Sequence, residues 1–186
     1  MTDANALDLR EVRKTYQVGD EEVVALDDAS LHVAADEIVA LVGPSGSGKT
    51  TLCSIAGGLL SATDGTVVVD GQDITGYSGR QLTDFRRSSV GFVFQSVNLV
   101  PFLTARENLL VVDELSLGLA PVIIGEVYQR LAEIRRLGTA LLLVEQYVEH
   151  ALGIAESIVV LRAGEVAYAG APLPTDELSQ LFLAAG

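Results

Sequence analysis

The residues with the most definite chemistry lie in one glycine-rich segment, residues 43–50, which reads GPSGSGKT. It matches the pattern G-x-x-x-x-G-K-[ST] in full, after an apolar run at 37–42 and before a helix-compatible run at 51–56. The glycines allow the backbone to wrap closely around phosphate groups, and the amide N–H groups and the start of the following helix supply positive potential there. The segment therefore predicts a site for a nucleoside triphosphate with magnesium.

Lys49 and Thr50 have the most specific expected tasks in this segment. Lys49 is expected to reach the β- and γ-phosphates, and the Thr50 hydroxyl is expected to bind magnesium. The other nucleotide-binding residues expected from the loop and the helix start are Gly43, Ser45, Gly46, Ser47, Gly48 and Thr51. The alternative is a glycine-rich turn that contains a lysine by chance, and the strand and helix expected on either side argue against it.

A second candidate site is the run LLVVDE at residues 109–114, an apolar strand that ends in two carboxylates. Magnesium needs oxygen ligands, so Asp113 at a strand end beside the phosphate loop is a candidate ligand, directly or through water. Glu114 is then expected to polarise the attacking water and is the candidate catalytic base. The alternative is an acidic turn that caps a buried strand, and the phosphate loop in the same chain favours the catalytic reading.

Short β-rich runs alternate with helical stretches, which is typical of an α/β domain, here a P-loop NTPase core with a mainly parallel sheet flanked by helices. Residues 7–33 differ, because two strand-like pieces broken at 18–20 predict a small antiparallel β subdomain. The chain is expected to be one domain, with the antiparallel part at about 1–35 and the P-loop core at about 36–186. Core strands are expected at 37–42, 65–70, 90–94, 109–112, 140–144 and 157–161, and helices at 78–87, 122–137 and 148–155.

Charge and composition narrow the range of functions. The formal net charge is −13 and the only lysines are Lys14 and Lys49, which argues against general affinity for nucleic acid. The single cysteine, Cys53, excludes an intramolecular disulfide and fits a reducing compartment. No apolar run reaches membrane-spanning length, and residues 1–9 lack the pattern of a secretory signal. We therefore expect a cytoplasmic chain with no transmembrane segment of its own.

With both motifs in this order, the chain resembles the ATP-binding proteins of ABC transporters over nearly all of its length. Tyr16, within VRKTY, stands where the family has an aromatic residue that stacks on adenine; the alternative is an ordinary strand tyrosine. Gln95, which ends VGFVFQ, stands at the family glutamine that contacts magnesium. Gln146 stands at the catalytic switch position, where a glutamine can donate a hydrogen bond to a γ-phosphate. His150 comes too late for that position and is expected to be a surface or packing residue.

The resemblance implies ATP and Mg²⁺ as ligands and ATP hydrolysis as the activity. It also implies a transmembrane permease as partner, and pairing with a second copy or a second ATPase at the inner face of the cell membrane. Up to about Asn108 the sequence is similar to lipoprotein-release and macrolide-export ATPases. From Leu109 onward, VVDELSLGLAP and LLVEQ are similar to the ATPases of branched-chain amino-acid importers. The direction of transport therefore stays open.

The chain lacks one part of the family pattern, a helical subdomain that ends in a serine-glycine-glycine-glutamine signature. Only residues 96–108 stand between the glutamine and the acidic strand, so a deletion is apparent near 108/109. Because a parallel crossover needs only about a dozen residues, we predict that residues 109–112 remain in the sheet through a short helix near 103–108. The similar stretch YSGRQ at 77–81 lies before the glutamine and is predicted to begin a helix, with Ser78 as its N-cap.

Two functions fit these observations. The first is an ATP-binding subunit of an ABC transporter that binds and hydrolyses MgATP to drive transport by a partner membrane domain. The second is a truncated or recombined cassette that binds ATP without effective hydrolysis or coupling. The missing subdomain favours it, as do Leu115 in place of the usual proline and Ala120 in place of an aspartate. A small-molecule kinase is disfavoured, because the region after Gly164 lacks basic residues that would bind a substrate.

Overall fold

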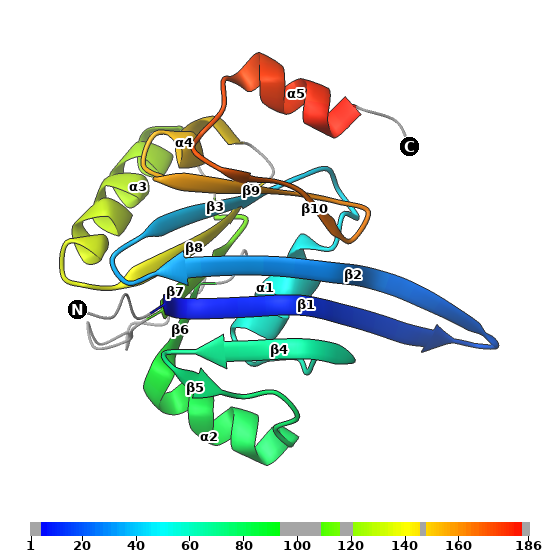
Figure 1. Ribbon diagram of the computed structural model, residues 1–186. Helices are drawn as coiled ribbons and strands as arrows, with labels where there is room; N and C mark the ends of the chain where they lie inside the picture. Colours follow the sequence, from blue (N-terminus) through cyan, green and yellow to red (C-terminus); the bar gives the residue numbers. More distant parts are fainter. Residues whose placement is uncertain (1–4, 94–108, 116–120, 146–147, 184–186) are drawn as a thin grey trace.

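The computed structural model describes residues 5–93, 109–115, 121–145 and 148–183, and these form two β-sheets (Figure 1). In the first sheet, β1 (Asn5–Val18) and β2 (Glu21–Ala34) make a long antiparallel hairpin. β4 (Asp64–Val69) and β5 (Gln72–Asp73) complete this sheet in the order β2-β1-β4-β5. The antiparallel sheet thus extends beyond the expected range of about 1–35, because β4 pairs with β1 across a sequence separation that no local pattern reveals.

The second sheet has six strands in the order β10-β9-β3-β8-β7-β6. These strands are β3 (Ile38–Val42), β6 (Val90–Val93), β7 (Leu109–Asp113), β8 (Ala140–Glu145), β9 (Ser157–Arg162) and β10 (Glu165–Gly170). All neighbouring strands are parallel except β9 and β10, which confirms the mainly parallel sheet, and β10 is an addition to the expected strands. β7 lies between β6 and β8, so the prediction that residues 109–112 remain in the sheet is confirmed. The short helix predicted near 103–108 lies outside the described residues.

The helices of the described ranges are α1 (Lys49–Ala56), α2 (Gly79–Ser89), α3 (Pro121–Arg135), α4 (Val148–Leu152) and α5 (Thr175–Leu183). Side chains of α1 and α2 share one apolar core with β1, β2 and β4, on one face of the parallel sheet. Helices α3, α4 and α5 lie on the opposite face (Figure 1), where their side chains share a second core. The central strand β3 is therefore buried on both faces, as is usual for a parallel strand. None of the helices seen in these ranges is long and apolar enough to cross a lipid bilayer.

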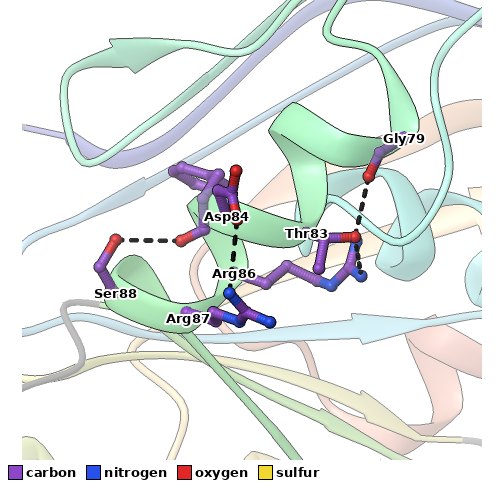
Figure 2. Close-up of polar contacts among 7 residues, drawn as sticks. Gly79, Thr83, Asp84, Arg86, Arg87 and Ser88 are labelled. Carbon is purple, nitrogen blue, oxygen red and sulfur yellow. Dashed lines mark hydrogen bonds and ion pairs between the residues drawn. The ribbon is translucent and has the colours of Figure 1, made fainter.

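Helix α2 begins at the predicted N-cap, Ser78. The Ser78 hydroxyl accepts a hydrogen bond from the Gln81 N–H, and the Ser78 N–H donates to Gln81 Oε1 at 2.9 Å, so the two residues form a capping box. In the next turns, Thr83 Oγ1 donates to the Gly79 carbonyl oxygen and Arg86 donates to Thr83 Oγ1 (Figure 2). The stretch YSGRQ is therefore a helix start, as predicted.

Candidate nucleotide site

The loop at residues 43–48 joins β3 to α1, and its backbone conformation depends on glycine. Gly43 has a φ of 156°, and a Cβ there would lie 2.1 Å from the carbonyl oxygen of Leu161. Gly48, the N-cap residue of α1, has a φ of 99°, and a Cβ there would lie 2.6 Å from the carbonyl oxygen of Ala25. Only a residue without a side chain fits such contacts. The loop therefore packs directly against the backbones of β2 and β9.

The start of α1 presents amide N–H groups suited to an anion. In the part of the chain that the structure describes, no side chain donates or accepts a capping bond at Gly48. The first N–H groups of a helix have no intrahelical partners, and the helix dipole gives them positive potential. The loop is held by bonds from the Ser47 N–H to the Pro44 carbonyl at 3.3 Å and from the Gly164 N–H to the Ser47 carbonyl at 3.0 Å. This geometry is suited to phosphate oxygens.

Lys49 places its cation inside the loop. The residue is 5% exposed, and its Nζ donates hydrogen bonds to the carbonyl oxygens of Gly43 at 2.9 Å and Pro44 at 3.0 Å. Burial lowers the pKa of the Lys49 ammonium, while the negative charges of Glu114 and Asp113 oppose that shift. The ammonium group is thus buried beside the acidic pair at the end of β7.

Asp113 and Glu114 are fixed by β8. Asp113 pairs with Val144 in the parallel ladder, and the Glu114 N–H donates to the Val144 carbonyl oxygen at 2.8 Å. Burial is the main cause that raises the pKa of Asp113; repulsion by Glu114 adds to it and Lys49 opposes it. Asp113 Oδ1 is buried and has no hydrogen-bond partner among the residues that the structure describes. A buried carboxylate oxygen of this kind is suited to a cation.

A pocket of about 470 Å³ lies over the loop and collects most of the predicted residues. The predicted site residues that line it are Ser45, Gly46, Gly48, Lys49, Thr50, Thr51 and Glu114. Gly43 and Ser47 instead hold the loop from behind, and Ser47 is almost fully buried. The structure therefore brings the glycine-rich loop and the acidic strand end, which are distant in sequence, to one cavity.

Tyr16 lies on β1 directly opposite Val23 of β2. Cross-strand partners project from the same face of a sheet, and Val23 lines the pocket. Tyr16 is 39% exposed, and Lys14 Nζ lies 5.3 Å from the centroid of its ring. Its adenine-stacking role stays a prediction. Gln95 and Gln146, the expected magnesium contact and switch residue, lie outside the described residues.

Sequence reasoning missed several residues at the site. Val23, Val24, Ala25 and Ala163 line the pocket, but they come from the β1–β2 hairpin and the β9–β10 turn, whose positions depend on tertiary packing. Glu145, a buried carboxylate at the end of β8, was also missed. The sequence signal for Glu145 was its position as a charged residue at the end of an otherwise apolar strand. His150 is exposed, as expected for a surface residue.

The residues present here fit magnesium, the ion that this chemistry implies. Magnesium binds oxygen ligands, and Asp113 supplies a buried carboxylate oxygen that has no other partner among the described residues. Thr50 supplies a hydroxyl from the first turn of α1 and lines the same pocket as Glu114. Asp113 does not line this pocket, but it lies close enough to Lys49 for the two charges to interact.

The sequence is similar to those of known ATP-binding proteins. A family model described as ABC transporter matches residues 26–159. The macrolide export ATP-binding/permease protein MacB of Shigella flexneri is 47% identical over 102 residues, which cover 55% of this chain and 16% of that protein. The uncharacterized ABC transporter ATP-binding protein MJ0796 of Methanocaldococcus jannaschii is 44% identical over 100 residues, covering 54% of this chain and 43% of that protein. The chain thus matches less than half of the length of either relative.

Solved structures resemble the whole fold. A dimeric, post-hydrolysis ATP-binding cassette, MJ0796 bound to ADP and Pi, superposes with a TM-score of 0.82 at 24% identity, covering 90% of this chain and 99% of that one. A nucleotide-free ATP-binding cassette from an ABC transporter superposes with a TM-score of 0.77 at 17% identity, covering 97% of this chain and 96% of that one. At these identities the likeness concerns the fold.

Proposed function

Because the chain belongs to the ABC transporter family, we propose that it binds MgATP at the pocket over residues 43–51 and hydrolyses it to drive a membrane partner. The observation that carries this proposal is the single cavity lined by the glycine-rich loop, Lys49 and Glu114. Lys49 supplies a cation, the start of α1 supplies amide N–H groups, and Glu114 supplies a carboxylate. The cation and the amide groups suit the phosphates of a nucleotide, and the carboxylate suits the attacking water.

Different residues are proposed to bind the phosphates and the magnesium ion. The amide groups of the loop and of the first turn of α1 bind phosphate oxygens, and Lys49 neutralises their charge from within the loop. Thr50 and Asp113 would hold magnesium, and Gln95 is proposed to contact it as well. When bound, magnesium neutralises charge that develops on the phosphate oxygens.

Glu114 is proposed as the residue that orients and polarises the attacking water. Glu114 lines the pocket, has a φ of 46°, and donates its backbone N–H to the Val144 carbonyl. A residue other than glycine rarely adopts a positive φ, so the surrounding structure must impose this conformation. Gln146 is proposed to donate a hydrogen bond to the γ-phosphate, and Tyr16 to stack on adenine beside Val23.

A second candidate function is ATP binding without effective hydrolysis. The observation that favours it is that β6 and β7 are adjacent parallel strands joined only by residues 94–108, which leaves no room in the sequence for a helical subdomain. The serine-glycine-glycine-glutamine signature is absent from the sequence. Such a chain would retain the loop but would lack a signature to offer to a second copy.

The proposed partners are a transmembrane permease and a second ATP-binding subunit, which is a second copy or a related chain. This places the chain at the cytoplasmic face of the membrane. The similarity to MacB, whose name joins an ATP-binding part to a permease, supports a membrane partner.

The test is magnesium-dependent ATP hydrolysis together with ATP binding by calorimetry, for the wild type, Lys49→Ala and Glu114→Gln. The full proposal expects hydrolysis in the wild type, loss of turnover with retained ATP binding in Glu114→Gln, and weaker ATP binding by about 10- to 100-fold in Lys49→Ala, since a bond to a charged group is lost. ATP binding without hydrolysis in the wild type would select the second candidate. Unchanged hydrolysis in Glu114→Gln would remove its catalytic assignment.

A further inference from the structure

Glu145 is a carboxylate in an apolar core. It ends β8, is 1% exposed, and follows Leu141 and Leu143 on the face that α3 and α4 cover. Tyr128 of α3, itself 5% exposed, donates its hydroxyl to Glu145 Oε1 at 2.6 Å. Burial, and then the bond to Glu145, raise the pKa of the Tyr128 hydroxyl, so this hydroxyl remains a donor. Burial of a carboxylate is costly unless hydrogen bonds compensate it, so this contact constrains where the end of β8 can lie.

The end of β8 lies between the two halves of the nucleotide site. On one side, Glu145 pairs with Val42, the residue before the phosphate loop. On the other side, Val144 pairs with Asp113, and its carbonyl accepts the Glu114 N–H at 2.8 Å. A shift of this strand end would therefore move the acidic pair relative to the loop.

Glu145 acts from the opposite face of the sheet. Along β8, Leu142 and Val144 belong to the core that contains α1, whereas Leu141 and Leu143 belong to the core that contains α3. Glu145 continues the second set and bonds to α3, and the backbone of Val144 links this strand end to Glu114.

We propose that Tyr128 and Glu145 are positioning residues: their buried hydrogen bond fixes the end of β8 and thereby the backbone of Glu114. Glu114 has a φ of 46°, a conformation that its neighbours must impose, and its bond to Val144 is the contact that ties it to β8. The effect on turnover rests on the proposed function, whereas the effect on the Glu114 backbone does not.

The deciding measurement is amide hydrogen exchange at Glu114, followed by NMR, in the full chain. Tyr128→Phe removes only the hydroxyl and is expected to speed exchange at Glu114 by at least about ten-fold, while exchange at Leu41 in β3 stays unchanged. Ile124→Val, which trims a buried side chain on the same helix, is the matched control and is expected to leave Glu114 unchanged. Equal exchange at Glu114 in Tyr128→Phe and Ile124→Val, or a uniform increase at Glu114 and Leu41, would overturn the proposal.

Two substitutions of Glu145 separate the hydrogen bond from simple packing. In the Glu145→Gln variant, the side-chain amide oxygen can still accept the hydrogen bond from the Tyr128 hydroxyl. Exchange at Glu114 is therefore expected to stay within about two-fold of the wild type. Glu145→Leu removes the acceptor and is expected to behave like Tyr128→Phe. If the exchange rate of the Glu114 amide is the same in Glu145→Leu as in Glu145→Gln, the proposal is contradicted. This comparison holds even if the Tyr128→Phe variant does not fold.

The same variants test the catalytic consequence. Tyr128→Phe is expected to lower kcat by at least about ten-fold with an unchanged KM for ATP, because the loop that binds the phosphates is intact. If the wild type does not hydrolyse ATP, the proposed hydrolysis fails, and the exchange data still decide the role of Tyr128 and Glu145. If the wild type hydrolyses ATP and Tyr128→Phe matches Ile124→Val in kcat, the positioning role is wrong.

Discussion

At the scale of single residues, the site depends on charges held away from water. Burial lowers the pKa of Lys49 and raises the pKa of Asp113, and the charges of the two groups oppose these shifts. The energetic cost falls on Asp113, whose pKa is raised mainly by burial and further by repulsion from Glu114. A ligand cation would remove that cost, so the protein keeps at this position a charge that is unfavourable without its ligand.

The first prediction is that Asp113→Asn stabilises the ligand-free protein. The pKa of Asp113 is higher in the folded protein than in the unfolded chain. The folded protein therefore loses stability as pH rises above the pKa that Asp113 has in the unfolded chain. The Tm of Asp113→Asn should therefore exceed that of the wild type at neutral pH, and the difference should shrink as pH falls into the range where Asp113 is protonated. Thermal unfolding followed by circular dichroism across pH gives the measurement.

Asp20→Asn, in the exposed turn of the β1–β2 hairpin, is the control for a lost acidic charge. It should change Tm little at any pH. An equal rise in Tm for Asp20→Asn would mean that the gain reflects the net charge of −13 rather than the burial of Asp113.

At the scale of elements, the phosphate loop is shaped by packing as well as by backbone freedom. Gly46 and Gly48 both have positive φ, at 77° and 99°. A Cβ at Gly46 would meet no described atom within 4 Å, whereas a Cβ at Gly48 would lie 2.6 Å from the Ala25 carbonyl oxygen and 2.9 Å from Leu26 Cδ2. A side chain at Gly46 would therefore meet only backbone strain, whereas a side chain at Gly48 would meet backbone strain and a clash with β2.

The second prediction is that Gly48→Ala is more destabilising than Gly46→Ala. Gly46→Ala should cost about 1–2 kcal/mol for the positive φ alone. Gly48→Ala should cost about 1–3 kcal/mol more, because β2 must move away from the loop. Urea unfolding gives the free energy of unfolding of both variants. Equal losses would show that β2 can move away from residue 48 without a loss of stability.

The third prediction concerns the capping box of α2. Ser78→Ala should lower the free energy of unfolding by about 1 kcal/mol, because it leaves the Gln81 N–H without its acceptor. Ser88→Ala is the matched change at the other end of the helix, where the hydroxyl bonds to the Phe85 carbonyl and contacts the Ser89 hydroxyl, both within the same helix (Figure 2). We expect its effect to stay within about 0.5 kcal/mol. A loss in Ser88→Ala as large as in Ser78→Ala would argue against a specific cap.

At the scale of the whole molecule, the two sheets share a core and should unfold together. Side chains of β1, β2 and β4 pack with those of α1 and with one face of β3, β7 and β8. Leu41 lies at the centre of this core with no exposed surface, whereas Leu137, after α3, is 69% exposed. The antiparallel sheet therefore forms part of the same packed unit as the nucleotide site.

The fourth prediction is that Leu41→Ala destabilises the entire chain by about 2–5 kcal/mol in a single transition, because it opens a cavity between the sheets. Leu137→Ala should stay within about 0.5 kcal/mol of the wild type. Far-ultraviolet circular dichroism and tyrosine fluorescence should give coincident urea transitions for Leu41→Ala. Separate transitions would indicate that the antiparallel sheet unfolds on its own.

The sequence by itself determined the features that depend on neighbours along the chain. The loop at residues 43–50, the strand that ends in Asp113 and Glu114, and the cap at Ser78 each lie within a few residues, so local periodicity and residue chemistry reveal them. The placement of residues 109–112 in the sheet was also predictable, because crossover length and an apolar strand leave little choice.

Only the tertiary structure decided which distant segments meet. The pairing of β4 with β1, the pocket wall from Val23 to Ala25, and the close approach of Ala25 to Gly48 depend on contacts between remote residues. The partnership of Tyr128 with Glu145 has the same origin, since a helix and a strand must first pack before a hydroxyl can reach a buried carboxylate. A sequence pattern records which faces are apolar, and packing geometry determines which apolar faces come together.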